Sequence, residues 1–469
     1  MIISGNSNIN KVIYSGYTIS KIYACGGSLV WPDTPPTPVG AYRFHVKKTD
    51  DTDVYSYCDG AYSGYSHIIQ NEVRYTVNGT SSGLGYVGDI AEINFGSCPS
   101  VSAIDEVFGA EINNTITAAT IENGSINHLA TGAFSNLKGL ESFIIPDSIT
   151  STETGVWANS GLKSVTIGSG LTKLNNDVFA NTNLRTVTIP SNITEIGNLV
   201  FRGCTALTSV NFENDSVTLI GNGAFKSCTN LRSIDIPSGV SIINDSTFAG
   251  CTSLTTFDFK NVNIINRGAF SGCTSLREVN LSGITTLGAS SFSGCTSLSG
   301  VTFSNSLRTI SEGAFYGCTS LSAVTLPSSV TGLSQNAFNY CSSLTSINLS
   351  NIEEIGNSAV GNTPISSVNL DNVYTIASYA FQNCNNLTDI TIGSNCISIG
   401  SNAFYNNAPT SSITLTISAT TPPTLSGTIF SYPVRVNAIY VPDASVEDYK
   451  SARYWNTYAD KIKPISEKP

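Results

Sequence analysis

Bulky apolar residues recur along most of the chain at a nearly constant interval. Adjacent members of this series lie 21 to 24 residues apart, and twelve of the thirteen are aromatic. Such a period is the mark of a protein built from stacked repeats, in which each unit contacts only its neighbours. We call these residues the anchors: Phe134, Trp157, Phe179, Phe201, Phe225, Phe248, Phe270, Phe292, Phe315, Phe338, Val360, Phe381 and Phe404.

The segment after each anchor alternates apolar and polar residues with period two. Leu184, Val187 and Ile189 are one example, and the pattern predicts a short strand whose apolar side faces the inside of the coil. Proline often ends this strand, as at Pro190. A second apolar pair follows, and a short helical or 3₁₀ turn is then expected to carry the next anchor. Stacking would produce parallel strands about 4.8 Å apart and a sheet on the order of 60 Å long.

Eight of the twelve cysteines lie three residues after an anchor: Cys204, Cys228, Cys251, Cys273, Cys295, Cys318, Cys341 and Cys384. No C-x-x-C pair occurs, and one cysteine per coil would stack identical thiols rather than form bridges or zinc sites. We therefore interpret them as small buried side chains at a tight turn. In three units without this cysteine, around Ser160, Thr182 and Thr363, the gap between the anchor and the strand shortens from six residues to five.

Composition limits the classes of partner. Charged residues make up 12% of the 469 residues, and 23 Lys and Arg face 33 Asp and Glu, for a net charge of −10. A protein that binds nucleic acid or an anionic membrane needs a basic surface, so neither partner is expected. No apolar run reaches the length of a membrane span, so no membrane insertion is expected. The first residues also lack the basic and apolar regions of a secretory signal.

The repeat resembles a known family. The pattern Ala-Phe-x-Gly-Cys-Thr-Ser-Leu-x-x-Val-x-Leu-Pro, around Phe315 to Pro327, resembles BspA-type (Treponema pallidum-type) leucine-rich repeats over about 112–430. The resemblance implies a right-handed solenoid of about thirteen coils, with a parallel β-sheet on its concave face. It also implies that the chain is a bacterial surface adhesin, a protist protein or a phage-encoded protein, the classes in which this family is found.

The flanks differ from the repeats. Residues 431–469 are expected to form a cap, with a final strand, a helix capped near Asp443, and Val446, Tyr449 and Trp455 covering the last coil. Residues 1–33 resemble N-terminal segments of phage virion proteins and are taken as an attachment segment. Residues 34–39 form a proline-rich linker. Residues 40–111 suggest a small β-rich module, with 42–46 and 72–77 as strand candidates.

Short catalytic and metal motifs lack the context that their chemistry needs. Residues 79–83 match G-x-S-x-G and residues 83–88 match G-x-G-x-x-G, but no α/β scaffold surrounds them. The acidic residues of 50–53 lack the glycine and the distal glutamate of a calcium loop. We expect no catalytic residue, no metal site and no cofactor, and therefore no enzyme.

The outward positions of the predicted strands are short and polar. One interpretation is a solvated sheet face. The other is a weak glycan site in the middle of the array, with carboxylates that accept hydrogen bonds from sugar hydroxyls; its candidates are Asp235, Asp258, Glu278, Asn280 and Thr302. The near absence of aromatic and arginine anchors argues against a tight protein hot spot on this face.

The leading hypothesis is a phage virion protein. Residues 1–33 would attach it to other virion proteins, and the solenoid would contact a bacterial surface glycan or protein. The alternative is a bacterial cell-surface adhesin, and the third candidate, a polysaccharide-cleaving enzyme, would need clustered carboxylates that the sequence does not show. The sequence leaves the oligomeric state open.

Overall fold

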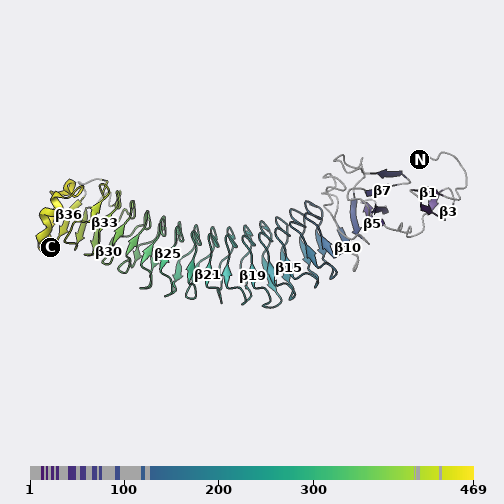
Figure 1. The fold of residues 1–469 in the computed structure, drawn as a ribbon, viewed down its shortest axis with the longest axis horizontal. Helices are drawn as coiled ribbons and strands as arrows, with labels where there is room; N and C mark the ends of the chain where they lie inside the picture. The colour runs from purple at the N-terminus through teal and green to yellow at the C-terminus, as the bar shows by residue number, and fades with distance from the viewer. Residues whose placement is uncertain are drawn as a thin grey trace.

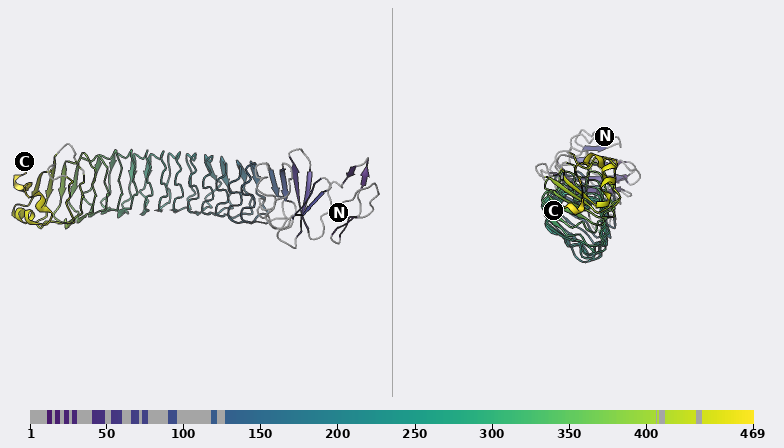
Figure 2. Two further views of the ribbon diagram at one scale, coloured as in Figure 1. Left: turned by 90° about the horizontal axis from the view of Figure 1, so that it is seen from above. Right: turned by 90° about the vertical axis from the view of Figure 1, so that its left-hand side faces the viewer.

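The computed structural model describes residues 127–405, 407, 412–431 and 436–469, and, before residue 127, the strands β1 to β10. The repeats stack into a gently curved rod, with β10 (Ala118–Ile121) at one end and the C-terminal residues at the other (Figure 1). Seen from above, the coils lie side by side along the whole rod (Figure 2). The predicted parallel solenoid is confirmed.

The main sheet is made of parallel strands, one from most coils. Neighbouring strands pair in register, for example Thr186 with Ser209 and Ile189 with Phe212. Small polar residues face outward and branched apolar residues face inward, as the period-two pattern predicts. The strands are β12 (Ser142–Ile144), β14 (Ser164–Thr166), β16 (Thr186–Ile189), β18 (Ser209–Phe212), β22 (Glu278–Asn280), β24 (Gly300–Thr302), β26 (Ala323–Val324), β28 (Ser346–Ile347), β30 (Ser367–Leu370), β32 (Asp389–Ile392), β34 (Ile413–Ile417), β36 (Val436–Val441) and β37 (Ile462–Pro464).

A second ladder runs along another side of the coil, where the sequence predicted only an apolar pair. Each of its strands is two residues long and pairs in parallel with a strand of a neighbouring coil, as Lys173 and Leu174 do with Glu195 and Ile196. Its members are β11 (His128–Leu129), β13 (Ser151–Thr152), β15 (Lys173–Leu174), β17 (Glu195–Ile196), β19 (Leu219–Ile220), β20 (Ile242–Ile243), β21 (Ile264–Ile265), β23 (Thr286–Leu287), β25 (Thr309–Ile310), β27 (Gly332–Leu333), β29 (Glu354–Ile355), β31 (Thr375–Ile376), β33 (Ser398–Ile399) and β35 (Thr424–Leu425).

The anchor segment is a chain of hydrogen-bonded turns, where we expected a short helical or 3₁₀ turn. In one coil the amides of Asp177, Phe179 and Asn181 donate to carbonyls of the following coil, at 2.9, 3.0 and 2.6 Å. Asp177 and Asn181 have φ of 55° and 56°, so residues on both sides of the anchor are left-handed. This backbone turns alternate amides toward the next coil, and it favours Gly, Asn, Asp and Ser at these positions. We call this side of the solenoid the turn face.

The anchors form a stacked column inside the coil. Consecutive rings lie 5.3 to 5.8 Å apart from Phe134 to Phe338, and the stack resumes from Phe381 through Phe404 to Phe430. Val360 interrupts it. Phe430 pairs with Phe404 as the next coil does, so the array has about fourteen turns, one more than we predicted.

The cysteines lie beside the ring column, fully buried and free, as expected. Each of the eight thiols donates a hydrogen bond to the main-chain carbonyl of the anchor in the preceding coil, with sulfur to oxygen distances of 3.1 to 3.3 Å. In the shortened coils Ser160, Thr182 and Thr363 take the same place, and each hydroxyl donates to the anchor carbonyl of its own coil. The position therefore serves as a hydrogen-bond donor as well as a packing site.

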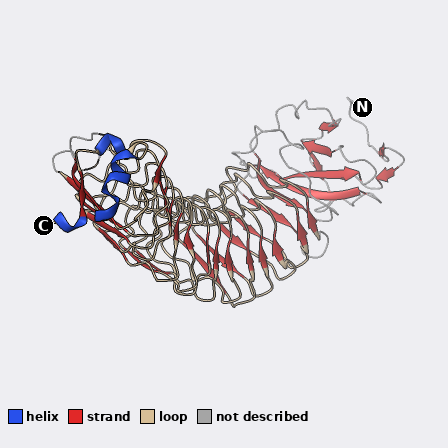
Figure 3. Cartoon of the chain, turned by 60° about the vertical axis from the view of Figure 1, so that its left-hand side comes forward, coloured by secondary structure: helices blue, strands red, loops and turns tan. Residues whose placement is uncertain are grey.

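The C-terminal residues close the open end of the stack (Figure 3). The 3₁₀ turn η3 (Asp443–Ser445) leads into α2 (Val446–Ser451), and η4 (Trp455–Tyr458) follows. Tyr449 and Trp455 are buried as expected, and they donate to the carbonyls of Ala419 and Pro423, both at 2.8 Å. Asp443 does not cap α2; it accepts a hydrogen bond from the amide of Ser466. A last 3₁₀ turn, η5 (Ile465–Glu467), follows β37.

The predicted N-terminal strands lie in a six-stranded sheet of order β10-β9-β5-β6-β7-β8. Its members before β10 are β5 (Ala41–Lys48), β6 (Asp53–Asp59), β7 (Ser66–Gln70), β8 (Val73–Thr76) and β9 (Ile90–Phe95). Two hairpins precede it, β1 (Val12–Tyr14) with β2 (Tyr17–Ile19) and β3 (Tyr23–Cys25) with β4 (Ser28–Val30). The attachment role of residues 1–33, the linker at 34–39 and the rejected motifs at 50–53 and 79–88 lie largely outside the described residues.

Candidate binding surfaces

The five residues proposed for a glycan site are all exposed on one side of the solenoid, but they do not form one site. Glu278 and Asn280 lie on β22 and Thr302 on β24, where Asn280 pairs with Thr302. Asp235 and Asp258 belong to the two preceding coils. Within this described part of the chain, 231–237 and 254–258 form no strand, so our prediction of a strand through Ile234 and Ile236 is wrong. The main sheet is interrupted there.

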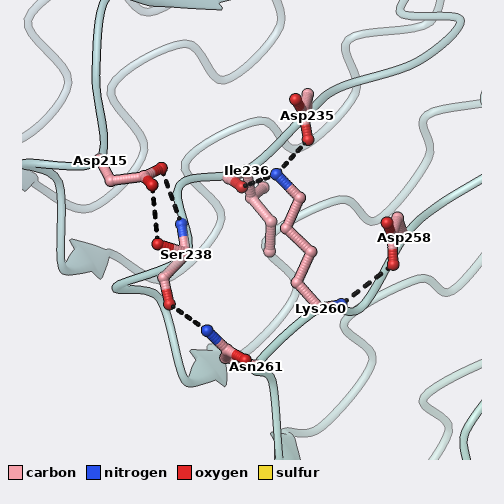
Figure 4. A network of polar contacts seen from close by, with 7 residues as sticks. All are labelled: Asp215, Asp235, Ile236, Ser238, Asp258, Lys260 and Asn261. Carbon is pink, nitrogen blue, oxygen red and sulfur yellow. Dashed lines mark hydrogen bonds and ion pairs between the residues drawn. The ribbon is translucent and has the colours of Figure 1, made fainter.

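Lys260 occupies the space in front of the two aspartates (Figure 4). Its ammonium forms an ion pair with Asp235 and donates to the carbonyl of Ile236 at 3.0 Å. Its amide donates to the Asp258 carboxylate at 3.1 Å, in a tight turn where Lys260 has a φ of 39°. The hydrogen bond with Asp235 raises the pKa of Lys260, and the charges of Asp235, Asp215 and Asp258 act in the same direction. Asp235 is thus paired with a cation, although its side chain stays 83% exposed.

Neighbouring polar side chains around Lys260 are also engaged. The Asp215 carboxylate accepts the amide and the hydroxyl of Ser238, at 3.0 and 2.8 Å, and Asn261 donates to the carbonyl of Ser238 at 3.0 Å (Figure 4). The amide hydrogen bond from Ser238 keeps the pKa of Asp215 below its usual value. These contacts join three successive coils, so this cluster holds the turns together rather than presenting free acids.

The turn face carries a feature that we did not predict. Four tyrosines from its C-terminal half are 38 to 49% exposed, and they form two edge-to-face pairs. The rings of Tyr316 and Tyr340 are 5.4 Å apart, and those of Tyr379 and Tyr405 are 6.1 Å apart. We call these four residues the tyrosine ridge. Tyr316 and Tyr405 follow an anchor directly, whereas Tyr340 and Tyr379 lie two residues after and before one, so no single repeat position carries them all.

A surface hollow of about 550 Å³ lies where the main-sheet strands of the first coils end. Ile144 borders it and is 69% exposed. Its two carboxylates already accept main-chain amides: Asp147 from Ser169 at 2.7 Å and Glu213 from Ser191 at 3.0 Å. These acids cap turns of neighbouring coils and are not open to a ligand.

Within the described residues, no group of three His, Cys, Asp or Glu side chains is placed to hold a metal ion. Across the same residues, no helix is long and apolar enough to cross a membrane.

Comparison with known proteins identifies the repeat. The model of the BspA type leucine rich repeat region matches residues 89–185, 172–287, 263–373 and 370–463, which together span most of the chain. A search of curated proteins finds no significant match.

Solved structures share the fold at low identity. A leucine-rich repeat protein from Bacteroides ovatus is 18% identical with a TM-score of 0.53, and the match covers 86% of this chain and 99% of that one. One from Eubacterium ventriosum is 17% identical with a TM-score of 0.46, over 74% and 94%. A leucine rich cell surface protein from Faecalibacterium prausnitzii is 24% identical with a TM-score of 0.38, over 60% and 86%.

Proposed function

The chain belongs to the BspA-type leucine-rich repeat family, and from that premise we propose that it is a bacterial cell-surface adhesion protein that binds a protein partner through the tyrosine ridge. The observation that carries this proposal is the pairing of four exposed tyrosines on a rigid, stacked scaffold. Tyrosine is enriched in binding hot spots because a large flat ring offers much contact area and loses little conformational freedom.

The position of the ridge supports a macromolecular partner. Its tyrosines belong to coils whose anchors run from Phe315 to Phe404, four coil spacings apart. At about 4.8 Å per coil, the ridge extends over roughly 20 Å, a length that suits a protein surface better than a small molecule. The stacked anchors beneath it keep the rings in place, which lowers the entropy cost of binding.

The proposal describes a binding protein without catalytic activity. Of the acids in the candidate strand site, Asp235 pairs with Lys260 and Asp258 accepts the amide of Lys260, and this argues against a pair of carboxylates poised for glycoside cleavage. The phage-virion hypothesis receives no support from the bacterial structures named above, and it stays a prediction. Detection of the intact chain in purified virions would test it.

Adhesion of coated beads tests the proposed surface. Beads carrying the full chain are applied to epithelial monolayers and to bacterial lawns, with and without protease treatment of the target. We expect adhesion that protease abolishes, and at least a tenfold loss when Tyr316, Tyr340, Tyr379 and Tyr405 are replaced by serine. The matched control replaces Glu278, Asn280 and Thr302 by alanine and should adhere normally. Loss in the control alone would place the binding surface on the main sheet instead.

Location is tested separately. Antibodies against the chain should label intact cells of the organism that produces it, and external protease should degrade it without lysis. Labelling only after lysis would contradict the proposed location.

A further inference from the structure

A single shortened coil leaves a notch in the turn face. In the flanking coils, the stretch between the cysteine and the next strand is two residues long: Ser342 with Ser343, and Asn385 with Asn386. Between them, the coil of Val360 has only Thr363 and Pro364 before Ile365. The two longer coils therefore project past the short one. The hollow measures about 350 Å³ and is lined by Ser342, Asn362, Thr363, Pro364, Asn383, Asn385 and Asn386.

The turn face and the second ladder continue through the short coil. The amide of Phe338 donates to Ala359 at 2.8 Å, the amide of Asn362 donates to Gln382 at 2.7 Å, and β29 pairs with β31. Thr363 is buried, and its hydroxyl donates to the carbonyl of Val360 at 2.8 Å. These hydrogen bonds hold the floor of the notch, although the ring column is interrupted at Val360 and β28 does not pair with β30.

The walls of the notch carry unused hydrogen-bonding groups. In a regular coil the equivalent carbonyl, that of Thr274, accepts the amide of Ser297 at 3.1 Å and the hydroxyl of Thr296 at 3.4 Å. No hydrogen bond from the described residues reaches the carbonyl or the hydroxyl of Ser342. Among the same residues, the amide side chain of Asn385 has no partner either.

Hydrogen bonds hold the side chains of the remaining asparagines of the notch in place. Asn362 donates to the Oδ1 of Asn339 at 2.8 Å, and Asn383 donates to the Oδ1 of Asn362 at 3.0 Å. Asn386 donates to the carbonyl of Pro364 at 3.3 Å, which leaves its Oδ1 as an acceptor. The notch thus offers donors and acceptors at fixed places, and none of its lining residues is charged.

We propose that this notch binds one residue of a neutral saccharide. A sugar hydroxyl both donates and accepts, so it can use an amide, a hydroxyl and a carbonyl together, whereas an anion or a cation would find no opposite charge. The volume lies at the lower end of the 300–1,000 Å³ typical of ligand pockets. The inference does not depend on the proposed adhesive role.

Ligand-observed NMR on the full chain tests the site with defined probes: the methyl glycosides of glucose, galactose, mannose and N-acetylglucosamine at millimolar concentration, with sodium sulfate as an anion control. We expect saturation transfer to at least one glycoside and none of the chemical-shift changes that sulfate binding would cause. Asn385→Ala should weaken binding at least tenfold. The control Asn263→Ala, at an exposed asparagine far from the notch, should leave binding unchanged.

A second variant fills the notch and replaces the Thr363 hydroxyl by the cysteine thiol of the regular coils. Replacing Thr363 and Pro364 by the sequence Cys-Thr-Ser, as in 318–320, restores the regular coil length. It should fold at least as well as the natural chain and lose saccharide binding. Binding that persists in this variant, or the absence of binding by every glycoside to the natural chain, would overturn the proposal. Because these measurements use the isolated protein, their failure would leave the bead-adhesion result unaffected.

Discussion

The thiol of Cys251 donates a hydrogen bond to the main-chain carbonyl of Phe225 in the preceding coil, over 3.1 Å. The same contact recurs along the cysteine positions, and it links the buried edge of each coil to the coil before it. Burial raises the pKa of Cys251 to about 12. Two properties of the protein follow from this contact.

Thiol labelling should distinguish the native protein, in which these cysteines are buried, from the unfolded protein. The thiolate is the reactive form, and burial suppresses it at neutral pH. We expect iodoacetamide at pH 8 to leave Cys251 and Cys295 unmodified in the native protein and to modify both in concentrated guanidinium. Peptide mass spectrometry after a timed quench gives the extent at each site. Rapid native labelling of Cys251 would mean that the column is open to solvent.

Alkaline pH should remove the contribution of the Cys251 thiol to stability. An unfolded thiol loses its proton near pH 8.5, whereas folded Cys251 retains it up to about pH 12. The folded state therefore binds more protons than the unfolded state in this window. The contribution of the thiol to the free energy of unfolding is fully present below about pH 8.5 and is lost as the pH rises to about 12. The free-energy difference between the natural protein and Cys251→Ala should shrink by about 1.4 kcal/mol per pH unit above 9. Urea titrations from pH 7.5 to 10.5 measure it; a constant difference would contradict the prediction.

The ring column should carry much of the stability of each coil. Phe270 lies 5.4 Å from Phe248 and 5.3 Å from Phe292, and Phe257 meets it edge-on at 4.8 Å. Phe270→Ala should cost about 3–5 kcal/mol, since it removes a buried ring and leaves a cavity. Tyr316→Ala, one residue after an anchor but on the surface, should cost well under half of that. Circular dichroism during urea unfolding compares them, and equal costs would argue against a continuous column.

Left-handed positions of the turn face should accept asparagine better than valine. Gly272 has a φ of 73°, and an added Cβ would lie 3.8 Å from the nearest backbone atoms of Gly250, so space is available and conformation decides. Asn181 occupies the equivalent position with a φ of 56°. We expect Gly272→Val to cost about 1–2 kcal/mol more than Gly272→Asn. Thermal unfolding of the pair measures the difference, and equal melting temperatures would show that φ is not limiting.

The periodic sequence predicts the coil but not all of its sides. The strands after each anchor are readable because Val187 and Ile189 alternate with threonines over several residues. The second ladder has two-residue strands such as Lys173–Leu174, too short for a period to show. The turn face was misjudged as helical, although glycine, asparagine and aspartate at both sides of the anchors carried the signal of left-handed backbone.

The binding surfaces were harder to predict because stacking brings together residues that are far apart in sequence. Asp235 looked like a free acid, but Lys260, one coil later, reaches back to it. The tyrosine ridge has no fixed place in the repeat, so alignment of the units does not reveal it. The shortened gap at Thr363 was visible in the sequence, whereas the notch requires the two longer neighbours on either side.

The notch shows how such a chain can change its surface at little risk. Each coil forms its ladders with the coils beside it, and the hydrogen bonds of the turn face continue through a coil that has lost one residue. A small deletion in the segment after an anchor can therefore open a new concavity while the turn-face hydrogen bonds and the second ladder continue from coil to coil. Gain or loss of single codons in these segments would let related genes vary what they recognise without evolving a new fold.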